Sequence, residues 1–347
     1  MQAAATYLDA RGRDWREGVA SVVDGRVQLA ADQPDAGMPR LDGIVTGGFT
    51  DAHVHLQLVD AAGLAGSALG RVVDLGGDPA VLSAVHNSSA LDTGSPESGD
   101  PNRDRPVLEE LRTTSGLEIA FAGAFLTPPG GYPSDRSWAP EGSVREISDA
   151  EAGAAAITEM KEAGATCIKV ASNSAAGPVF SDEMFTTIVD IAASHDMSVI
   201  AHAEGPGEAQ RATRLRARIL AHAPFTERLT DAELHAMRGS ISWISTLAVH
   251  DGDAYDTAVD NVRRFHALGG NVVYGTDMGN GPTPVGVNPR EIAALREAGV
   301  DGIELLQSLA PVDPTAPASR LLFYPGCTSA TADPLVGRLL TPADLEP

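Results

Sequence analysis

Apolar segments of strand length alternate with segments in which apolar residues recur every three to four positions, from about residue 47 to residue 310. Such alternation predicts strands that are separated by amphipathic helices. The first expected strand is the apolar run 41–45, which leads into residues 47–56. The other expected strands cover residues 71–77, 118–123, 166–171, 198–202, 218–222, 241–245 and 271–277.

Capping residues mark where several of the expected helices begin and end. Ser148 and Glu151 form the Ser-x-x-Glu pattern of a capping box, and Gly164 provides a C-terminal stop for that helix. Thr230 and Glu233 repeat the capping pattern. Further helices are expected over residues 181–195 and 255–268 and from Asn288 onward, where a proline follows the capping residue.

Eight strands alternating with helices predict an α/β chain with a (β/α)8 TIM barrel over residues 47–310. A doubly wound open sheet is less favoured, because no Gly-x-Gly-x-x-Gly turn follows the first strand. Residues 1–46 contain short alternating segments around Asp24-Gly25, which is a hairpin signal. With the proline-rich residues 311–347 they are expected to form a small β-sandwich domain from both chain ends. Residues 86–105 are polar and are expected to form a long loop.

Composition limits the classes of partner and the cellular location. The 347 residues carry a net charge of −22, which disfavours binding to nucleic acid or to anionic membranes and favours solubility. The expected partner is a small-molecule substrate. No segment approaches the roughly 20 apolar residues of a membrane span, and no secretory signal is recognisable at the start. Cys167 and Cys327 are the two cysteines, so a reducing cytoplasmic location is expected. A homo-oligomer is compatible with these features.

Metal-ligand side chains recur where the expected strands end. His53 and His55 lie two residues apart, so in an extended chain both imidazoles point to the same side. Lys169, His202, His222 and Asp277 lie in or at the ends of later strands, and the carboxyl ends of barrel strands carry the active sites of this architecture. Since imidazole is a common ligand of zinc-like metals, the sequence predicts a metal site at this end. Lys169 is also one of only two lysines among 25 basic residues.

The same segments resemble a known family. Gly-Phe-Thr-Asp-Ala-His53-Val-His55, Cys-Ile-Lys169-Val, Ile-Ala-His202-Ala-Glu, Leu-Ala-His222 and Gly-Thr-Asp277 are similar to the metal-binding motifs of the amidohydrolase superfamily. The segments at 71–77 and 126–131 resemble its imidazolonepropionase-like branch, which includes Xaa-Pro dipeptidases. The resemblance implies a hydrolase that cleaves C–N bonds in small amides, cyclic amides or dipeptide-like molecules, by means of a water that bridges two divalent ions.

Residue roles follow from this resemblance. It implies that His53, His55 and Asp277 hold the more buried metal, that His202 and His222 hold the second, and that Lys169, carbamylated by CO₂, bridges them. Asp277 would also accept the proton of the bridging water. Zinc is the first expectation, with Mn²⁺ or Co²⁺ as alternatives. The residues after Asp277 and the C-terminal tail depart from the family pattern, which puts the substrate in doubt more than the reaction.

Two other functions stay open at this point. A mononuclear deaminase or imidazolonepropionase-type hydrolase would use Lys169 only structurally, with Glu204 as a candidate acid. A barrel that binds a metal or ligand without catalysis is the alternative from a different class. Tyr132, Trp138 and Glu204 are the candidates for contact with the substrate.

Overall fold

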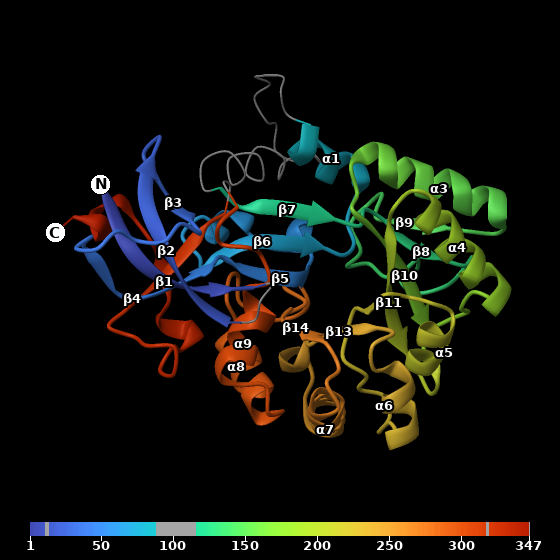
Figure 1. Ribbon diagram of the computed structural model, residues 1–347. Coiled ribbons are helices and arrows are strands. Elements are labelled where there is room, and N and C mark those ends of the chain that lie inside the picture. Colours follow the sequence, from blue (N-terminus) through green and yellow to red (C-terminus); the bar gives the residue numbers. More distant parts are fainter. Residues whose placement is uncertain (11–13, 88–115, 317–318, 347) are drawn as a thin grey trace.

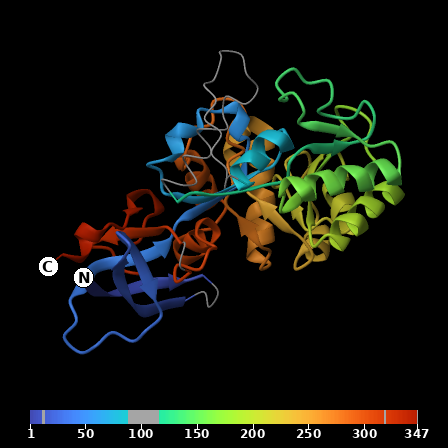
Figure 2. The ribbon, with the colours of Figure 1, turned by 90° about the horizontal axis from the view of Figure 1, so that it is seen from above.

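The computed structural model describes residues 1–10, 14–87, 116–316 and 319–346 and has a mixed α/β architecture with three sheets (Figure 1). Parallel strands and their helices occupy one part of the molecule. A separate sheet, which contains strands from both chain ends, occupies the other part, and both termini lie there (Figure 2). Among the described residues, no helix has the length and apolar character required to cross a bilayer.

The terminal sheet has six strands in the order β16-β15-β4-β1-β2-β3. Asp24 and Gly25 connect β2 to β3 with φ values of 49° and 76°, which is the left-handed backbone of a tight hairpin turn, and the predicted hairpin is confirmed. Its core includes Tyr7, Val45 and Phe323. The strands are β1 (Gln2–Asp9), β2 (Asp14–Val23), β3 (Arg26–Ala30), β4 (Arg40–Gly47), β15 (Leu321–Pro325) and β16 (Arg338–Leu339).

The remaining strands form a parallel sheet of seven and a parallel sheet of three. The larger has the order β14-β13-β12-β11-β10-β8-β9 and the smaller the order β5-β6-β7. The smaller sheet consists of β5 (Phe49–Val54), β6 (Leu69–Asp74) and β7 (Glu118–Phe121). The larger consists of β8 (Phe125–Thr127), β9 (Val144–Glu146), β10 (Cys167–Asn173), β11 (Ser198–Glu204), β12 (Ile219–Leu220), β13 (Ser242–Ile244) and β14 (Val272–Val273).

Hydrogen bonds connect the two parallel sheets at two places. The backbone N–H of Ala52 in β5 donates to the carbonyl of Tyr274, next to β14, at 3.1 Å. The N–H of Thr166, just before β10, donates to the carbonyl of Phe121 in β7 at 2.9 Å. The carboxyl ends of strands from both sheets therefore face a common region. Every residue of β10 is buried, which is typical of a parallel strand that is covered on both faces.

Helices cover the outer faces of the parallel strands (Figures 1 and 2). The predicted caps at Thr230 and Asn288 are confirmed, as is the glycine stop at Gly164, and Ser181, expected as the first helical residue, caps α4. The helices are α1 (Pro79–Asn87), α3 (Ala150–Ala163), α4 (Asp182–Ser194), α5 (Glu208–Arg214), α6 (Asp231–Met237), α7 (Gly252–Ala267), α8 (Pro289–Glu297) and α9 (Gly302–Leu309).

Three local predictions differ from the structure. Asp149, not Ser148, caps α3, because its carboxylate accepts the N–H of Ala152 and the charged acceptor suits a helix N-terminus. The apolar run 41–45 belongs to β4 of the terminal sheet, and β5 is the strand that carries His53. In the segment expected as a loop, residues 86–87 belong to α1 and residues 88–105 lie outside the described part of the chain.

Candidate metal and active site

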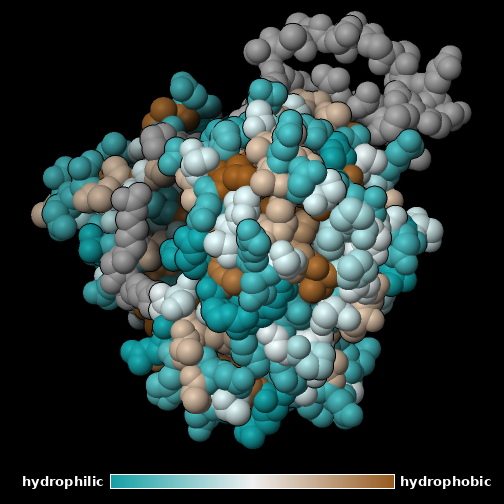
Figure 3. Space-filling view, turned by 90° about the vertical axis from the view of Figure 1, so that its right-hand side faces the viewer, coloured by the Kyte–Doolittle hydropathy of each residue, from teal (hydrophilic) through white to brown (hydrophobic). Residues whose placement is uncertain are grey.

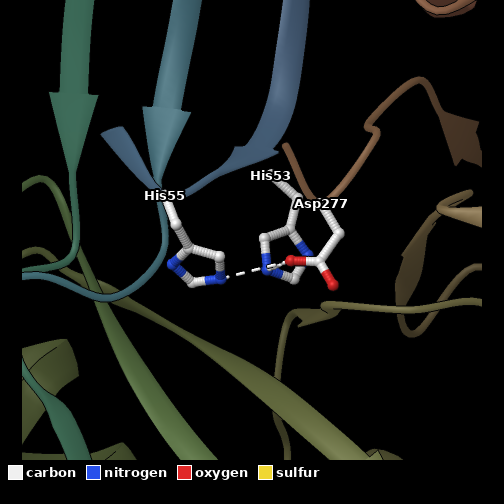
Figure 4. Close-up of side chains that lie close together, drawn as sticks. All are labelled: His53, His55 and Asp277. Carbon is white, nitrogen blue, oxygen red and sulfur yellow. Dashed lines mark ion pairs between the residues drawn. The ribbon is translucent and has the colours of Figure 1, made fainter. Parts of the chain in front are cut away.

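Two histidines and an aspartate that lie far apart in the sequence converge at one point (Figure 4). His53 lies in β5, His55 follows it, and Asp277 follows β14. One ligand atom of each lies within 4.8 Å of the others, and all three residues are buried. The Nε2 atoms of both imidazoles lie 3.2 Å from the same oxygen, Oδ1 of Asp277.

Backbone carbonyls determine which nitrogen of each imidazole is protonated. Nδ1 of His53 lies 2.8 Å from the carbonyl of Ala221, and Nδ1 of His55 lies 3.1 Å from that of Gly76. A carbonyl only accepts, so each Nδ1 donates a proton, and in the neutral ring the lone pair is on Nε2. Burial lowers the pKa of His53 well below its usual value, which favours the neutral ring. Burial alone would lower the pKa of His55, but the carboxylate of Asp277 raises it, so a proton lies between His55 and Asp277. A divalent cation would replace this proton and be held by the same three atoms.

Asp277 has a backbone conformation that is unusual for a residue with a side chain. Its φ is 55°, in the left-handed region, and such conformations occur often at functional sites. Burial alone would raise the pKa of its carboxyl, but His53 and His55 lower the pKa well below its usual value. Asn280 donates its side-chain N–H to Oδ2 at 2.8 Å, which leaves Oδ1 to face the imidazoles.

Lys169 is a fully buried cation beside this group. Its Nζ lies 3.4 Å from Nε2 of His53, and the ring of Phe125 lies 5.8 Å away. Burial lowers the pKa of the ammonium to about 8. A measurable share of the neutral amine is therefore present near neutral pH, and the neutral amine is the form that reacts with CO₂.

His202 in β11 and His222, which follows β12 by two residues, extend the imidazole cluster. The ring of His222 lies 4.8 Å from that of His53 and 4.9 Å from that of His202, as centroid distances. Nε2 of His202 lies 3.0 Å from Oε2 of Glu204, while Nδ1 of His222 lies 2.9 Å from the hydroxyl of Thr246. His202 thus has a carboxylate partner at Nε2.

One cavity of about 470 Å³ brings all of the predicted site residues together. Ligand pockets for small molecules are typically of this size. On the side toward which β6 and β7 point in Figure 1, apolar side chains lie scattered among hydrophilic ones at the surface (Figure 3). The predicted residues that line the cavity are His53, His55, Tyr132, Trp138, Lys169, His202, Glu204, His222 and Asp277. Their individual roles stay predictions.

Aromatic rings form two walls of this cavity. On one side Trp138 lies 6.1 Å from Phe125 and 6.1 Å from Tyr132, and Tyr132 stacks on His202. Burial, together with the charges of Asp277 and Glu204, raises the pKa of Tyr132 to about 12, so its hydroxyl stays protonated. The rings of Phe225 and His250, which stack at 4.1 Å, line another part of the cavity.

Sequence reasoning missed several residues of this site. His250 lies outside the expected strands and, as a lone histidine, carries no spacing signal, and Phe125 and Phe225 give no signal beyond apolarity. Nε2 of His250 is buried and has no hydrogen-bond partner among the described residues. Two buried carboxylates were also missed, Asp51 and Asp74. Asp51 did offer a signal, since it precedes His53 by two residues and lies in the same motif.

Comparisons with known proteins support the fold. No family model and no curated protein sequence matches the chain. A Xaa-Pro dipeptidase with methionine bound in its active site matches at 16% identity, with a TM-score of 0.66 and 94% of each chain covered. The ochratoxinase of A. niger matches at 14% identity and a TM-score of 0.68, with 98% of this chain and 94% of that chain covered. An enamidase described as a member of the amidohydrolase superfamily matches at 13% identity and a TM-score of 0.55, with 100% and 95% covered. The resemblance inferred from the motifs is confirmed at the level of the fold.

Proposed function

We propose that this chain, which has the fold of Xaa-Pro dipeptidases and related amidohydrolases, is a metal-dependent hydrolase of C–N bonds in small molecules. The substrate class is an amide, cyclic amide or dipeptide-like molecule. The observation that carries the proposal is the convergence of two imidazole Nε2 atoms on Oδ1 of Asp277, at 3.2 Å each, inside a cavity of about 470 Å³. Methionine in the active site of the dipeptidase structure is consistent with an amino-acid-sized substrate.

The strands β5 to β7 and β10 to β14 are proposed to form one (β/α)8 barrel over residues 47–310, with β8 and β9 as an addition at the edge of the larger sheet. The hydrogen bonds from Ala52 to Tyr274 and from Thr166 to Phe121 support closure at both edges. Residues 1–46 and 311–347 would then form the small domain, in which β1 to β4 share a sheet with β15 and β16. Active sites of such barrels lie at the carboxyl ends of the strands, which is where the cavity lies.

His53, His55 and Asp277 would hold one divalent ion, and His202, His222 and a carbamylated Lys169 would complete a site for two. A bound divalent ion lowers the pKa of its water and polarises the substrate carbonyl. Carbamylation forms a bond between the neutral Nζ of Lys169 and the carbon of CO₂ with release of a proton, and it converts a repelled cation into an anionic ligand. The low pKa of Lys169 favours this step.

Asp277 is assigned the transfer of a proton from the attacking water to the leaving amine. Its Oδ2 is held by Asn280 at 2.8 Å, so the carboxylate is oriented before the substrate arrives. The walls formed by Trp138 and Tyr132 would bind an apolar part of the substrate, and the polar rim at Glu204 would bind a donor group.

A mononuclear hydrolase or deaminase is the second candidate, and one contact favours it. Nε2 of His202 is paired with Glu204 at 3.0 Å, so a second metal would have to replace this partner. In that case Lys169 would be unmodified and Glu204 would be the acid that acts on the substrate. A barrel that binds metal without catalysis is the third candidate.

A chelation and reconstitution experiment tests the proposal. Protein stripped with a chelator is assayed against a panel of dipeptides, N-acyl amino acids, cyclic amides and aminopurines, and then reloaded with zinc, manganese or cobalt while bound metal is counted. Hydrolysis of an amide that returns with two metals per chain supports the leading proposal. Full activity with one metal favours the mononuclear enzyme. Full activity without metal would overturn both, and metal binding without hydrolysis or deamination anywhere in a wide panel would favour the non-catalytic barrel.

A further inference from the structure

Asp51 is a fully buried carboxylate that no step of the proposed reaction uses. It lies in β5 two residues before His53, and its oxygens face the segment that follows β14. Oδ1 accepts the backbone N–H of Thr276 at 3.0 Å, and Oδ2 accepts the hydroxyl of Thr276 at 2.6 Å. Oδ1 also accepts the backbone N–H of His53 at 3.1 Å.

These contacts connect the two segments that carry the converging ligands. Thr276 immediately precedes Asp277, so one carboxylate holds the backbone of His53 and the residue next to Asp277 at the same time. The neighbouring contacts between the segments are plain backbone hydrogen bonds, from Ala52 to Tyr274 at 3.1 Å and from His55 to Met278 at 2.7 Å. Between these two backbone contacts, the side chain of Asp51 connects the segment of His53 to the segment of Asp277.

The local backbone explains why a side chain is used at this place. Asp277 has a φ of 55°, so the chain leaves the extended conformation there and cannot continue a regular ladder with β5. The segments also approach closely, since a Cβ atom on Gly275 would lie 3.1 Å from the backbone nitrogen of His53. A short carboxylate fits this gap and accepts from both segments.

The geometry points to Asp51 as a positioning residue that, through Thr276, sets the separation of His53 and Asp277 for metal binding. This inference rests on the proposed metal centre, since it assigns the purpose of the link to that centre. Partners that orient metal ligands commonly contribute 10- to 100-fold to metal affinity. The Asp51 link is expected to contribute an effect of that size.

The test measures the affinity of the metal-free protein for its first equivalent of zinc, by calorimetry against a competing chelator, together with the visible spectrum of the cobalt-loaded protein. Asp51→Asn is expected to weaken zinc binding about 10- to 100-fold and to change the cobalt spectrum. Thr276→Val removes the hydroxyl and leaves the side chain of Asp51 in place, so it breaks the link without a substitution at Asp51. It is expected to weaken binding, while Thr276→Ser is expected to bind nearly as the parent protein does.

Glu208→Gln is the matched control. Glu208 is also a buried carboxylate, with Ser172 and Arg211 as its partners, and it contacts neither ligand segment. Its variant is expected to lower the melting temperature of the metal-free protein without weakening zinc binding. The double variant that carries Asp51→Asn and Thr276→Val should have the same zinc affinity as Asp51→Asn alone, because both substitutions break the same link.

Two kinds of result would overturn the inference, and they are distinguishable. Unchanged zinc affinity in Thr276→Val and Asp51→Asn, or an equal loss in Glu208→Gln, would leave the metal centre intact but remove the positioning role. Failure of the parent protein to bind zinc would remove the proposed metal centre and the inference together. If Asp51→Asn does not fold, the zinc affinities of Thr276→Val and Thr276→Ser still test whether the link positions the ligands.

Discussion

Replacement of Asp277 by asparagine is expected to abolish most hydrolysis while the chain keeps its fold. Oδ1 of Asp277 is the common point of the two Nε2 atoms at 3.2 Å, and Oδ2 is held by Asn280. An asparagine of the same shape can keep one oxygen in place, but it has no charge to offer a metal and cannot accept the proton of the attacking water. Loss of a general base costs ~10²–10⁴ in rate. At 1.36 kcal/mol for each factor of ten, this corresponds to about 3 to 5 kcal/mol of transition-state stabilisation.

The assay compares steady-state kinetics and bound metal in parallel, at saturating zinc. Asp190→Asn is the control, because Asp190 lies on the surface in an ion pair with Arg216. It should leave kcat and metal content unchanged. A rate for Asp277→Asn within threefold of the parent, with its metals in place, would show that another group moves the proton. A loss of rate that parallels loss of the folded protein would show that Asp277 is structural.

Three further outcomes are expected. Lys169→Ala should lose one of two metals and most activity, with partial recovery in acetate or bicarbonate, whereas Lys169→Arg should not recover; metal analysis with and without these anions checks this. Trp138→Ala should raise KM about tenfold with a smaller change in kcat, because the ring forms an apolar wall of the cavity. Steady-state kinetics checks this, and a change in kcat alone would contradict it. Burial raises the pKa of Glu291 to about 7, so its contribution to stability is greatest below its ordinary pKa near 4.5 and is lost as pH rises through 7. Denaturant titrations should therefore show that the free energy of unfolding falls between pH 4.5 and pH 8 by up to about 3 kcal/mol less in Glu291→Gln than in the parent protein. Parallel curves of unfolding free energy against pH for the two proteins would contradict the assignment.

Much of the fold could be predicted because periodicity and caps are local. The α4 helix begins after Ser181 and buries Phe185 and Ile188 as the pattern of apolar residues requires. The short strands were harder: β12 contains only Ile219 and Leu220, and its place between β11 and β13 depends on long-range pairing. Two adjacent side chains, those of Ser148 and Asp149, can each accept a hydrogen bond at the start of α3, and the local pattern did not show that Asp149 is the cap.

The candidate site was predictable where spacing carries geometry. His53 and His55 lie on one side of an extended segment, and both reach Asp277. His202 and Glu204 have the same spacing, yet they pair with each other, and spacing cannot distinguish a ligand from a partner. The role of Asp51 depends on a contact across 225 residues of chain, which no local pattern encodes.

A crystal structure of the zinc-loaded, active protein, with anomalous scattering measured at the zinc edge, tests the metal centre most directly. The expected result is a zinc peak bound by Nε2 of His53, Nε2 of His55 and the carboxylate of Asp277. A second peak is expected beside His222, with extra density on Nζ of Lys169 that joins the two. An active protein with no anomalous peak at His53, His55 and Asp277 would contradict the account.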